Sequence, residues 1–154
     1  MRFLCDEMLV RLARLLRAAG HDAALAPAQA PDAALIARAE AEDRLLLTRD
    51  RALARRAAER GLLLRAEAAV AQAEELSQAV PVDWSLAPFT RCVMDNSPLR
   101  QASPEETARM PGSAQTLGGP FRVCPTCGRL YWPGSHVKRM TARLERLAGR
   151  PGTS

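Results

Sequence analysis

Short apolar runs alternate with segments of helical periodicity along the first half of the chain. Strands are expected over residues 2–5, 21–26, 45–48 and 62–65, the second of them weak. Helices are expected over residues 8–19, 32–43 and 51–60, and over an Ala/Glu/Gln segment that ends near residue 79. Gly20 and Gly61 follow two of these helices as stop signals. Strands that alternate with helices of this length predict an α/β fold, in which helices flank both faces of a parallel sheet.

The alternation ends near residue 80, where Pro, Gly, Ser and Cys become more frequent. Ser103 begins a capping-box pattern and predicts a helix start. Residues 111–120 are expected to form a loop, and residues 136–148 an amphipathic helix with basic side chains around its apolar face. We therefore expect an α/β domain over residues 1–83, a small module over residues 84–150 and a disordered polar tail over residues 151–154.

Two of the expected strands end in an acidic residue. Asp6 follows the first strand, Asp50 follows the third, and Asp32 begins a helix between them. The carboxyl ends of parallel strands meet at one edge of the sheet, where α/β folds build their sites. Carboxylates that converge there repel one another unless a cation neutralises them, and Mg²⁺ or Mn²⁺ prefers such oxygen ligands. The pattern predicts a metal site of Asp6, Asp32 and Asp50, with Glu7 outside the direct ligand set.

Simpler roles are open for two of these acids, because Asp32 and Asp50 could each cap the helix that follows. Two other acid-rimmed folds lack a required residue here. A receiver domain needs a lysine late in its sheet, and the one lysine of this chain, Lys138, lies outside the α/β region. A haloacid-dehalogenase-like site needs D-x-D after the first strand. The chain also has no glycine-rich phosphate loop, which disfavours nucleotide cofactors.

The cysteines of the second half have the spacing of metal ligands. Cys124 and Cys127 form a C-P-T-C-G turn, and Cys92 with Asp95 forms an upstream pair in which the second position is an aspartate. Three thiolates and one carboxylate could hold Zn²⁺, less tightly than four thiolates. The alternative is a degenerate module without metal, packed by its aromatic residues. Cys5 lies inside an expected strand and is most simply a core residue.

The charge of the chain is unevenly distributed. Residues 1–91 carry 13 basic and 13 acidic side chains, whereas residues 92–154 carry 9 basic and 4 acidic ones, so the formal net charge of +5 belongs to the second segment. This asymmetry suits a module that meets a polyanion, although the presence of 21 Arg and one Lys is equally consistent with genome composition. The side chains expected to contact RNA are Arg49, Tyr131, Trp132, His136, Lys138, Arg139 and Arg143.

Two of these assignments have open alternatives. Tyr131 and Trp132 could stack on bases, or they could form the small core of the module. His136 could act as a catalytic acid, a phosphate contact, a zinc ligand or a helix cap. Arg residues interrupt every apolar run, so no membrane span is expected, and Asp6 and Glu7 lie where a secretory signal would be apolar. We expect a soluble, cytoplasmic protein.

Several blocks of the sequence together resemble the Mut-seven C-terminal RNase domain family. They are Phe3-Leu4-Cys5-Asp6, Leu12-Ala13-Arg14-Leu15-Leu16-Arg17, Gly20-His21-Asp22, Leu46-Leu47-Thr48-Arg49-Asp50-Arg51, Pro88-Phe89-Thr90-Arg91-Cys92, the stretch from Cys124 to His136, and Arg139-Met140. The resemblance implies a PIN-like nuclease fold with a C-terminal zinc ribbon. It implies a metal-dependent ribonuclease whose acids match Asp6, Asp32 and Asp50. The family pattern has a cysteine where this chain has Asp95.

The primary hypothesis is an endoribonuclease in which Mg²⁺ or Mn²⁺ activates water and neutralises a phosphodiester oxygen, while the basic module docks RNA. The alternative is a non-catalytic RNA-binding or adaptor protein of the same fold. A third hypothesis is a structural zinc module that serves a protein partner.

Overall fold

A computed structural model describes residues 1–149, and the expected tail of residues 151–154 lies outside them. Its first half contains four strands and four α-helices in alternation. The strands are β1 (Arg2–Cys5), β2 (Ala23–Leu25), β3 (Arg44–Thr48) and β4 (Gly61–Leu63). The helices are α1 (Val10–Ala18), α2 (Asp32–Ala41), α3 (Arg51–Ala57) and α4 (Ala69–Ala79), with 3-10 turns η1 (Glu7–Leu9) and η2 (Ala58–Arg60). The α/β alternation expected from the sequence is confirmed.

The four strands form one parallel sheet in the order β2-β1-β3-β4. Cys5 pairs with Leu25 on one side and with Leu47 on the other, so β1 and β3 are central neighbours. The chain moves outward in one direction from β1 to β2 and in the opposite direction through β3 and β4. The boundary between β1 and β3 is therefore the point at which ligand crevices form in open α/β sheets.

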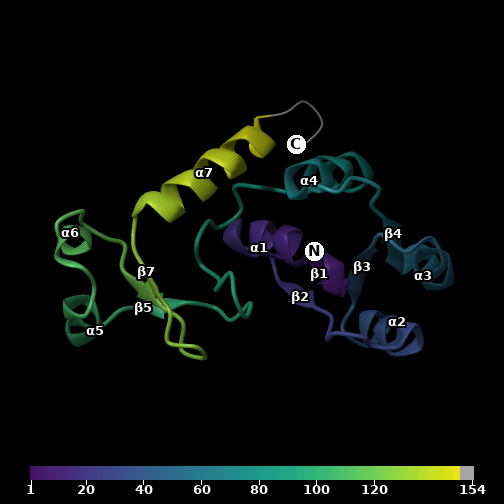
Figure 1. The fold of residues 1–154 in the computed structure, drawn as a ribbon, viewed down its shortest axis with the longest axis horizontal. Helices are drawn as coiled ribbons and strands as arrows, with labels where there is room; N and C mark the ends of the chain where they lie inside the picture. The colour runs from purple at the N-terminus through teal and green to yellow at the C-terminus, as the bar shows by residue number, and fades with distance from the viewer. Residues whose placement is uncertain (150–154) are drawn as a thin grey trace.

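Helices cover both faces of this sheet (Figure 1). Leu12 and Leu16 of α1 and Leu76 of α4 pack on one face, whereas Leu35 of α2 and Leu53 of α3 pack on the other. The helical spacing of the apolar residues in the sequence places these side chains on the buried face of each helix. None of the helices among residues 1–149 has the length and apolar character needed to span a membrane.

A second, antiparallel sheet follows in the order β5-β6-β7. Its elements, with the helices around it, are β5 (Arg100–Gln101), α5 (Pro104–Ala108), α6 (Gly112–Gln115), β6 (Arg122–Val123), β7 (Leu130–Tyr131) and α7 (Ser135–Ala148). The predicted capping box is present, since Ser103 accepts from the Glu106 amide and Glu106 accepts from the Ser103 amide. The expectation of a loop over residues 111–120 is wrong in part, because α6 forms one helical turn that buries Ala114.

One helix end also differs from the prediction. The helix expected over residues 51–60 is regular only to Ala57, where Ala58 takes a φ of +52° and a 3-10 turn follows. Gly61 opens β4 instead of merely ending the helix, and a side chain there would meet the Ala54 carbonyl oxygen at 2.6 Å. Close helix–strand approach therefore explains this glycine.

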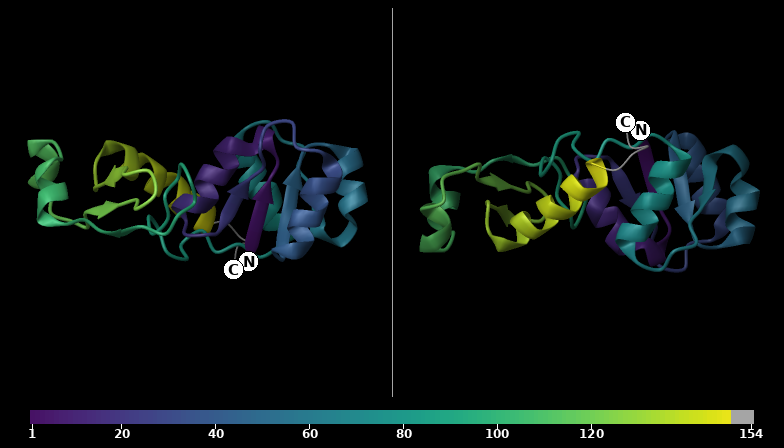
Figure 2. Two further views of the ribbon diagram at one scale, coloured as in Figure 1. Left: turned by 90° about the horizontal axis from the view of Figure 1, so that it is seen from below. Right: turned by 90° about the horizontal axis from the view of Figure 1, so that it is seen from above.

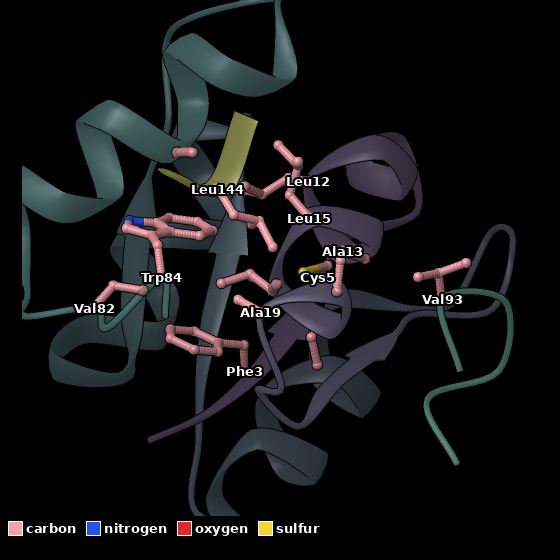
Figure 3. Close-up of a cluster of buried hydrophobic side chains, with 14 of the residues drawn as sticks. Phe3, Cys5, Leu12, Ala13, Leu15, Ala19, Val82, Trp84, Val93 and Leu144 are labelled. Carbon is pink, nitrogen blue, oxygen red and sulfur yellow. The ribbon is translucent and has the colours of Figure 1, made fainter. Parts of the chain in front are cut away.

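The helix α7 returns from the antiparallel sheet to the parallel one (Figures 1 and 2). Its Leu144 and Leu147 are buried in the same cluster as Trp84 and the inner face of α1. Figure 3 draws Trp84 and Leu144 together with side chains of α1. One hydrophobic core therefore includes residues from both halves of the chain.

Polar contacts hold the turn over residues 92–96 against the parallel sheet. Arg17, 5% exposed, donates to the carbonyl oxygens of Ala23, Val93 and Met94. Asn96 donates to Asp22 Oδ1 at 2.7 Å and accepts from the Ala23 amide. The placement of this turn is thus determined by the first helix and by the start of β2.

Candidate functional site

Asp6 and Asp50 lie at the central point of the carboxyl edge and are joined through Thr48. The Asp6 amide donates to the Leu47 carbonyl oxygen, so Asp6 directly continues the β1–β3 pairing. The Thr48 hydroxyl donates to Asp6 Oδ2 at 2.7 Å and accepts from the Asp50 amide at 3.0 Å. Thr48 is fully buried, which orients its hydroxyl group. Sequence reasoning missed Thr48, and its polar side chain at the end of an apolar strand was the available signal.

Asp50 also caps α3, as the simpler interpretation expects. Its Oδ1 accepts from the amides of Ala52 and Leu53 at 2.8 and 3.3 Å. Residues 1–149 provide no hydrogen bond to its Oδ2. Capping therefore fixes the side chain through one oxygen and leaves the other available to a ligand.

Asp32 does not cap α2, and that alternative is wrong. Pro31 occupies the N-cap position, and Asp32 is the first residue of the helix. The Asp32 carboxylate instead accepts from Arg56 of α3 at 3.4 Å, and both side chains are more than one third exposed. An ion pair of this exposure contributes little to stability. The carboxylate is therefore not fixed by strong contacts.

Glu7 and Arg49 lie beside this edge. Glu7 turns away from Asp6 and accepts from the Gln29 amide at 3.1 Å, in the loop that precedes α2. Arg49 reaches the carbonyl oxygen of Arg65 at 3.4 Å, while its buried Nε has no hydrogen-bond partner among the described residues. Both side chains thus stay near the strand ends.

The predicted sulfur ligands come together. The ligand atoms of Cys92, Asp95, Cys124 and Cys127 all lie within 4.8 Å of one another. Cys92 Sγ and Cys127 Sγ are 3.7 Å apart, close to the separation of about 3.8 Å expected in a tetrahedral zinc site with Zn–S bonds of about 2.3 Å. Within residues 1–149 these four side chains are the one group that converges in this way. The carboxylate oxygens of Asp6, Asp32 and Asp50 do not lie as close to one another as these four ligand atoms do.

The pKa values within the cluster show the effect of crowding. Burial opposes ionisation of Asp95, but hydrogen bonds from Ser97 and Cys124 outweigh it and lower its pKa to about 2. For Cys127, a backbone hydrogen bond from Arg129 favours the thiolate. Burial and the neighbouring Cys124, Cys92 and Asp95 outweigh that bond and raise the pKa to about 12. A bound cation would favour the thiolate and relieve this repulsion. The donor set and its geometry therefore fit a metal ion.

Tyr131 and Trp132 are adjacent in the sequence but lie in different surroundings. Tyr131 is 5% exposed, accepts from the Val93 amide and donates to Cys92 Sγ at 3.2 Å. Its proposed stacking on RNA is therefore corrected: it is a core residue that supports the sulfur cluster. Trp132 is half-buried and lines a cavity of about 180 Å³ with Phe89 and Arg122. An aromatic wall there is open to a planar ligand.

The basic residues of α7 face different surroundings. Lys138 and Arg139 are exposed, and neither has an ion pair among the residues described. His136 and Arg143 line a cavity shared with α1, and burial followed by the nearby Arg129, Arg139 and Arg14 lowers the pKa of His136. Arg11, Arg14 and Arg129 line the same cavity. Sequence reasoning missed these three, because they lie on separate segments.

The comparisons with known proteins identify one family. A family model described as Mut7-C RNAse domain matches residues 1–144, which is most of the chain. No curated protein and no solved structure matches the chain.

Proposed function

Because the chain belongs to the Mut7-C RNAse domain family, for which a ribonuclease-type function is indicated, we propose that it hydrolyses RNA at the edge formed by Asp6 and Asp50. The observation that carries the proposal is the Asp6–Thr48–Asp50 connection across the central strands. The proposed third metal ligand is Asp32, whose carboxylate would leave its weak contact with Arg56 when the metal binds. Mg²⁺ or Mn²⁺ bound there would supply an activated water and neutralise a phosphodiester oxygen.

The protein's own contribution is to position the oxygen ligands. Thr48 fixes the rotamer of Asp6 by a hydrogen bond, and the first amides of α3 hold Asp50 through Oδ1. These contacts reduce the entropy that the two carboxylates would lose on binding a cation. The donors fit a hard cation, although the geometry is less complete than that of the sulfur cluster.

The proposal extends to the second sheet. We propose that Cys92, Asp95, Cys124 and Cys127 bind zinc, so that the second sheet forms a zinc ribbon. We also propose that the four-stranded sheet belongs to a PIN-like domain. A division at residues 83/84 follows the sequence pattern and stays a prediction. The basic side chains of α7 would then help to dock RNA.

The test uses the isosteric variants Asp6→Asn and Asp50→Asn. Asparagine caps a helix about as well as aspartate, so Asp50→Asn removes the charge without removing the cap. Each variant should lower Mn²⁺-dependent cleavage of a single-stranded RNA by roughly 100-fold or more, with an unchanged circular dichroism melt. Asp43→Asn is the matched control, because Asp43 is an exposed acid that precedes β3, at the opposite end of that strand from Thr48. Undiminished cleavage by both site variants would refute the proposal.

A second candidate function is RNA binding without catalysis. The observation that favours it is that Asp32 is held by Arg56 and the three carboxylates do not converge. This candidate predicts salt-sensitive RNA binding with no turnover in Mg²⁺ or Mn²⁺. The cleavage assay above decides between the two functions.

A further inference from the structure

A cavity of about 390 Å³ lies where the two halves of the chain meet. Its walls come from α1, from the residues that begin α4, from α7 and from the two turns that carry the sulfur cluster. Four arginines, Arg11, Arg14, Arg129 and Arg143, line it together with His136, and no acidic residue of the described part of the chain does. Segments distant in sequence thus converge on one basic cavity.

The arginines of this cavity have no carboxylate partner among residues 1–149, unlike the arginines that form the ion pairs of the structure. Arg2, Arg38, Arg44, Arg56, Arg60 and Arg100 all form ion pairs with carboxylates. No ion pair within residues 1–149 involves Arg11, Arg14, Arg129 or Arg143, and Arg129 only stacks over the Tyr131 ring at 5.9 Å. Like charges around one cavity repel, and an anion that enters it removes the repulsion.

The size and lining of the cavity indicate more than a bare ion. Leu15, Val70, Val93 and Met140 supply an apolar surface between the cations. A volume of about 390 Å³ falls within the range of small-ligand sites and exceeds the needs of a phosphate group alone. The ligand that fits carries a phosphate and a less polar portion, as a nucleotide unit does.

The cavity lies next to the acidic edge. Arg11 is five residues after Asp6, and α1 starts from the end of β1. The 3-10 turn η1 lies between them, and five residues span at most about 17 Å even when extended, so one RNA strand can contact both places. The residues that begin α4 line the cavity and also follow a strand of the same parallel sheet.

We propose that this cavity binds a phosphate-bearing nucleotide unit of single-stranded RNA and so aligns the strand with the acidic edge. The identification of the polyanion as RNA rests on the proposed function. The phosphate could belong to the interior of the strand or to its 5′ end.

The test measures RNA affinity by fluorescence anisotropy without added Mg²⁺ or Mn²⁺, so that no turnover is required. The double variant Arg14→Gln/Arg143→Gln removes two cavity charges from exposed helix positions. The control Arg55→Gln/Arg109→Gln removes the same charge from exposed positions outside the cavity. The cavity variant should lose about tenfold or more in affinity and show a shallower salt dependence, whereas the control should lose at most about twofold.

Two probes of one sequence, with a 5′-phosphate and with a 5′-hydroxyl, separate the sources of the phosphate. An equal loss for both probes assigns the cavity to an interior phosphate, and a loss confined to the 5′-phosphate probe assigns it to the end. Equal losses for the cavity variant and the control, or no loss at all, would overturn the proposal. If cleavage depends on Asp6 but binding does not depend on the cavity, the cavity proposal is wrong and the proposed nuclease function stands. If binding depends on the cavity but no RNA is cleaved, the proposed nuclease function is wrong and the cavity proposal stands.

Discussion

Asp22 connects the start of β2 to the turn over residues 92–96. Its carboxylate accepts from Arg44 at 2.7 Å, from Asn96 at 2.7 Å and from Arg2 at 3.1 Å. Burial opposes ionisation of Asp22, but the hydrogen bonds from these three side chains outweigh it and hold its pKa below the ordinary value of 3.8. Arg44 is itself buried, so the contact is not a surface pair.

Asp22→Asn should destabilise the protein by about 2 kcal/mol near pH 6, because it removes one of the two carboxylates that pair with the buried Arg44, the other being Glu42. The folded state binds the Asp22 proton more weakly than the unfolded state does. The stabilisation is therefore complete above pH 3.8 and is lost as the pH falls through that value toward the lower folded-state pKa. Urea unfolding at pH 6 and pH 3 checks this, and a difference between wild type and variant that is equal at both values would contradict it.

The acidic site and the basic cavity differ in how far the sequence predicts them. Asp6 and Asp50 follow recognisable strands, so local pattern and the general rule for strand ends were sufficient. The cavity could not be predicted, because Arg14 is an ordinary exposed residue of an amphipathic helix until α7 places Arg143 beside it. Tyr131 illustrates a different difficulty. An aromatic residue beside the Cys124–Cys127 turn is equally compatible with a core position and with a surface position, so the sequence could not decide between the two.

At the scale of elements, periodicity predicted the longer helices and strands and failed for the shortest ones. The pattern over residues 2–5 and 45–48 corresponds to β1 and β3 within one residue. The strands β5, β6 and β7 have two residues each, which is too few for any alternation to be visible. Their pairing is determined by tertiary contacts, chiefly the packing around the sulfur cluster.

The sulfur cluster joins two turns that are distant in the sequence. Cys92 and Asp95 belong to one turn and Cys124 and Cys127 to the other, and Ser97 with Thr126 adds a hydrogen bond of 2.9 Å between them. A metal ion bound to all four ligands would stabilise the folded state, because the unfolded chain lacks the preformed site.

Purified protein should therefore contain one zinc ion per chain, and Cys127→Ser should lose it. The loss of the metal should lower the melting temperature by about 5 °C or more, since about 2 kcal/mol corresponds to such a shift in a chain of this length. Elemental analysis and calorimetry, with the exposed Ser113→Ala as control, test this. If the protein contains no zinc when it is purified after metal-replete expression, the module is metal-free and the prediction is wrong.

At the scale of the whole molecule, the two sheets depend on one hydrophobic core. Trp84, Val93, Leu144 and Leu147 cover α1 from positions outside the parallel sheet, and all four are buried. Each such side chain contributes about 2 kcal/mol or more on burial, so together they match a large part of the usual stability of a domain. The two halves are therefore expected to fold together.

A fragment of residues 1–83 should fail to unfold cooperatively, whereas the full chain should show a single transition. The reason is that the fragment exposes to water the side chains of α1 that Trp84, Leu144 and Leu147 cover in the full chain. Near-ultraviolet circular dichroism and a thermal melt measure this, and addition of residues 84–154 as a second peptide should restore the transition. A stable, cooperatively unfolding fragment would contradict the shared-core argument.

The return of α7 to α1 has a consequence for the order in which a ribosome makes this protein. Arg11 and Arg14 are synthesised before the antiparallel sheet, and the wall that carries His136 and Arg143 is synthesised after it. A nascent chain that still lacks this wall has the acidic strand ends without the cavity beside them. If the cavity binds RNA as proposed, this capacity would arise only after α7 has been synthesised and has packed against α1.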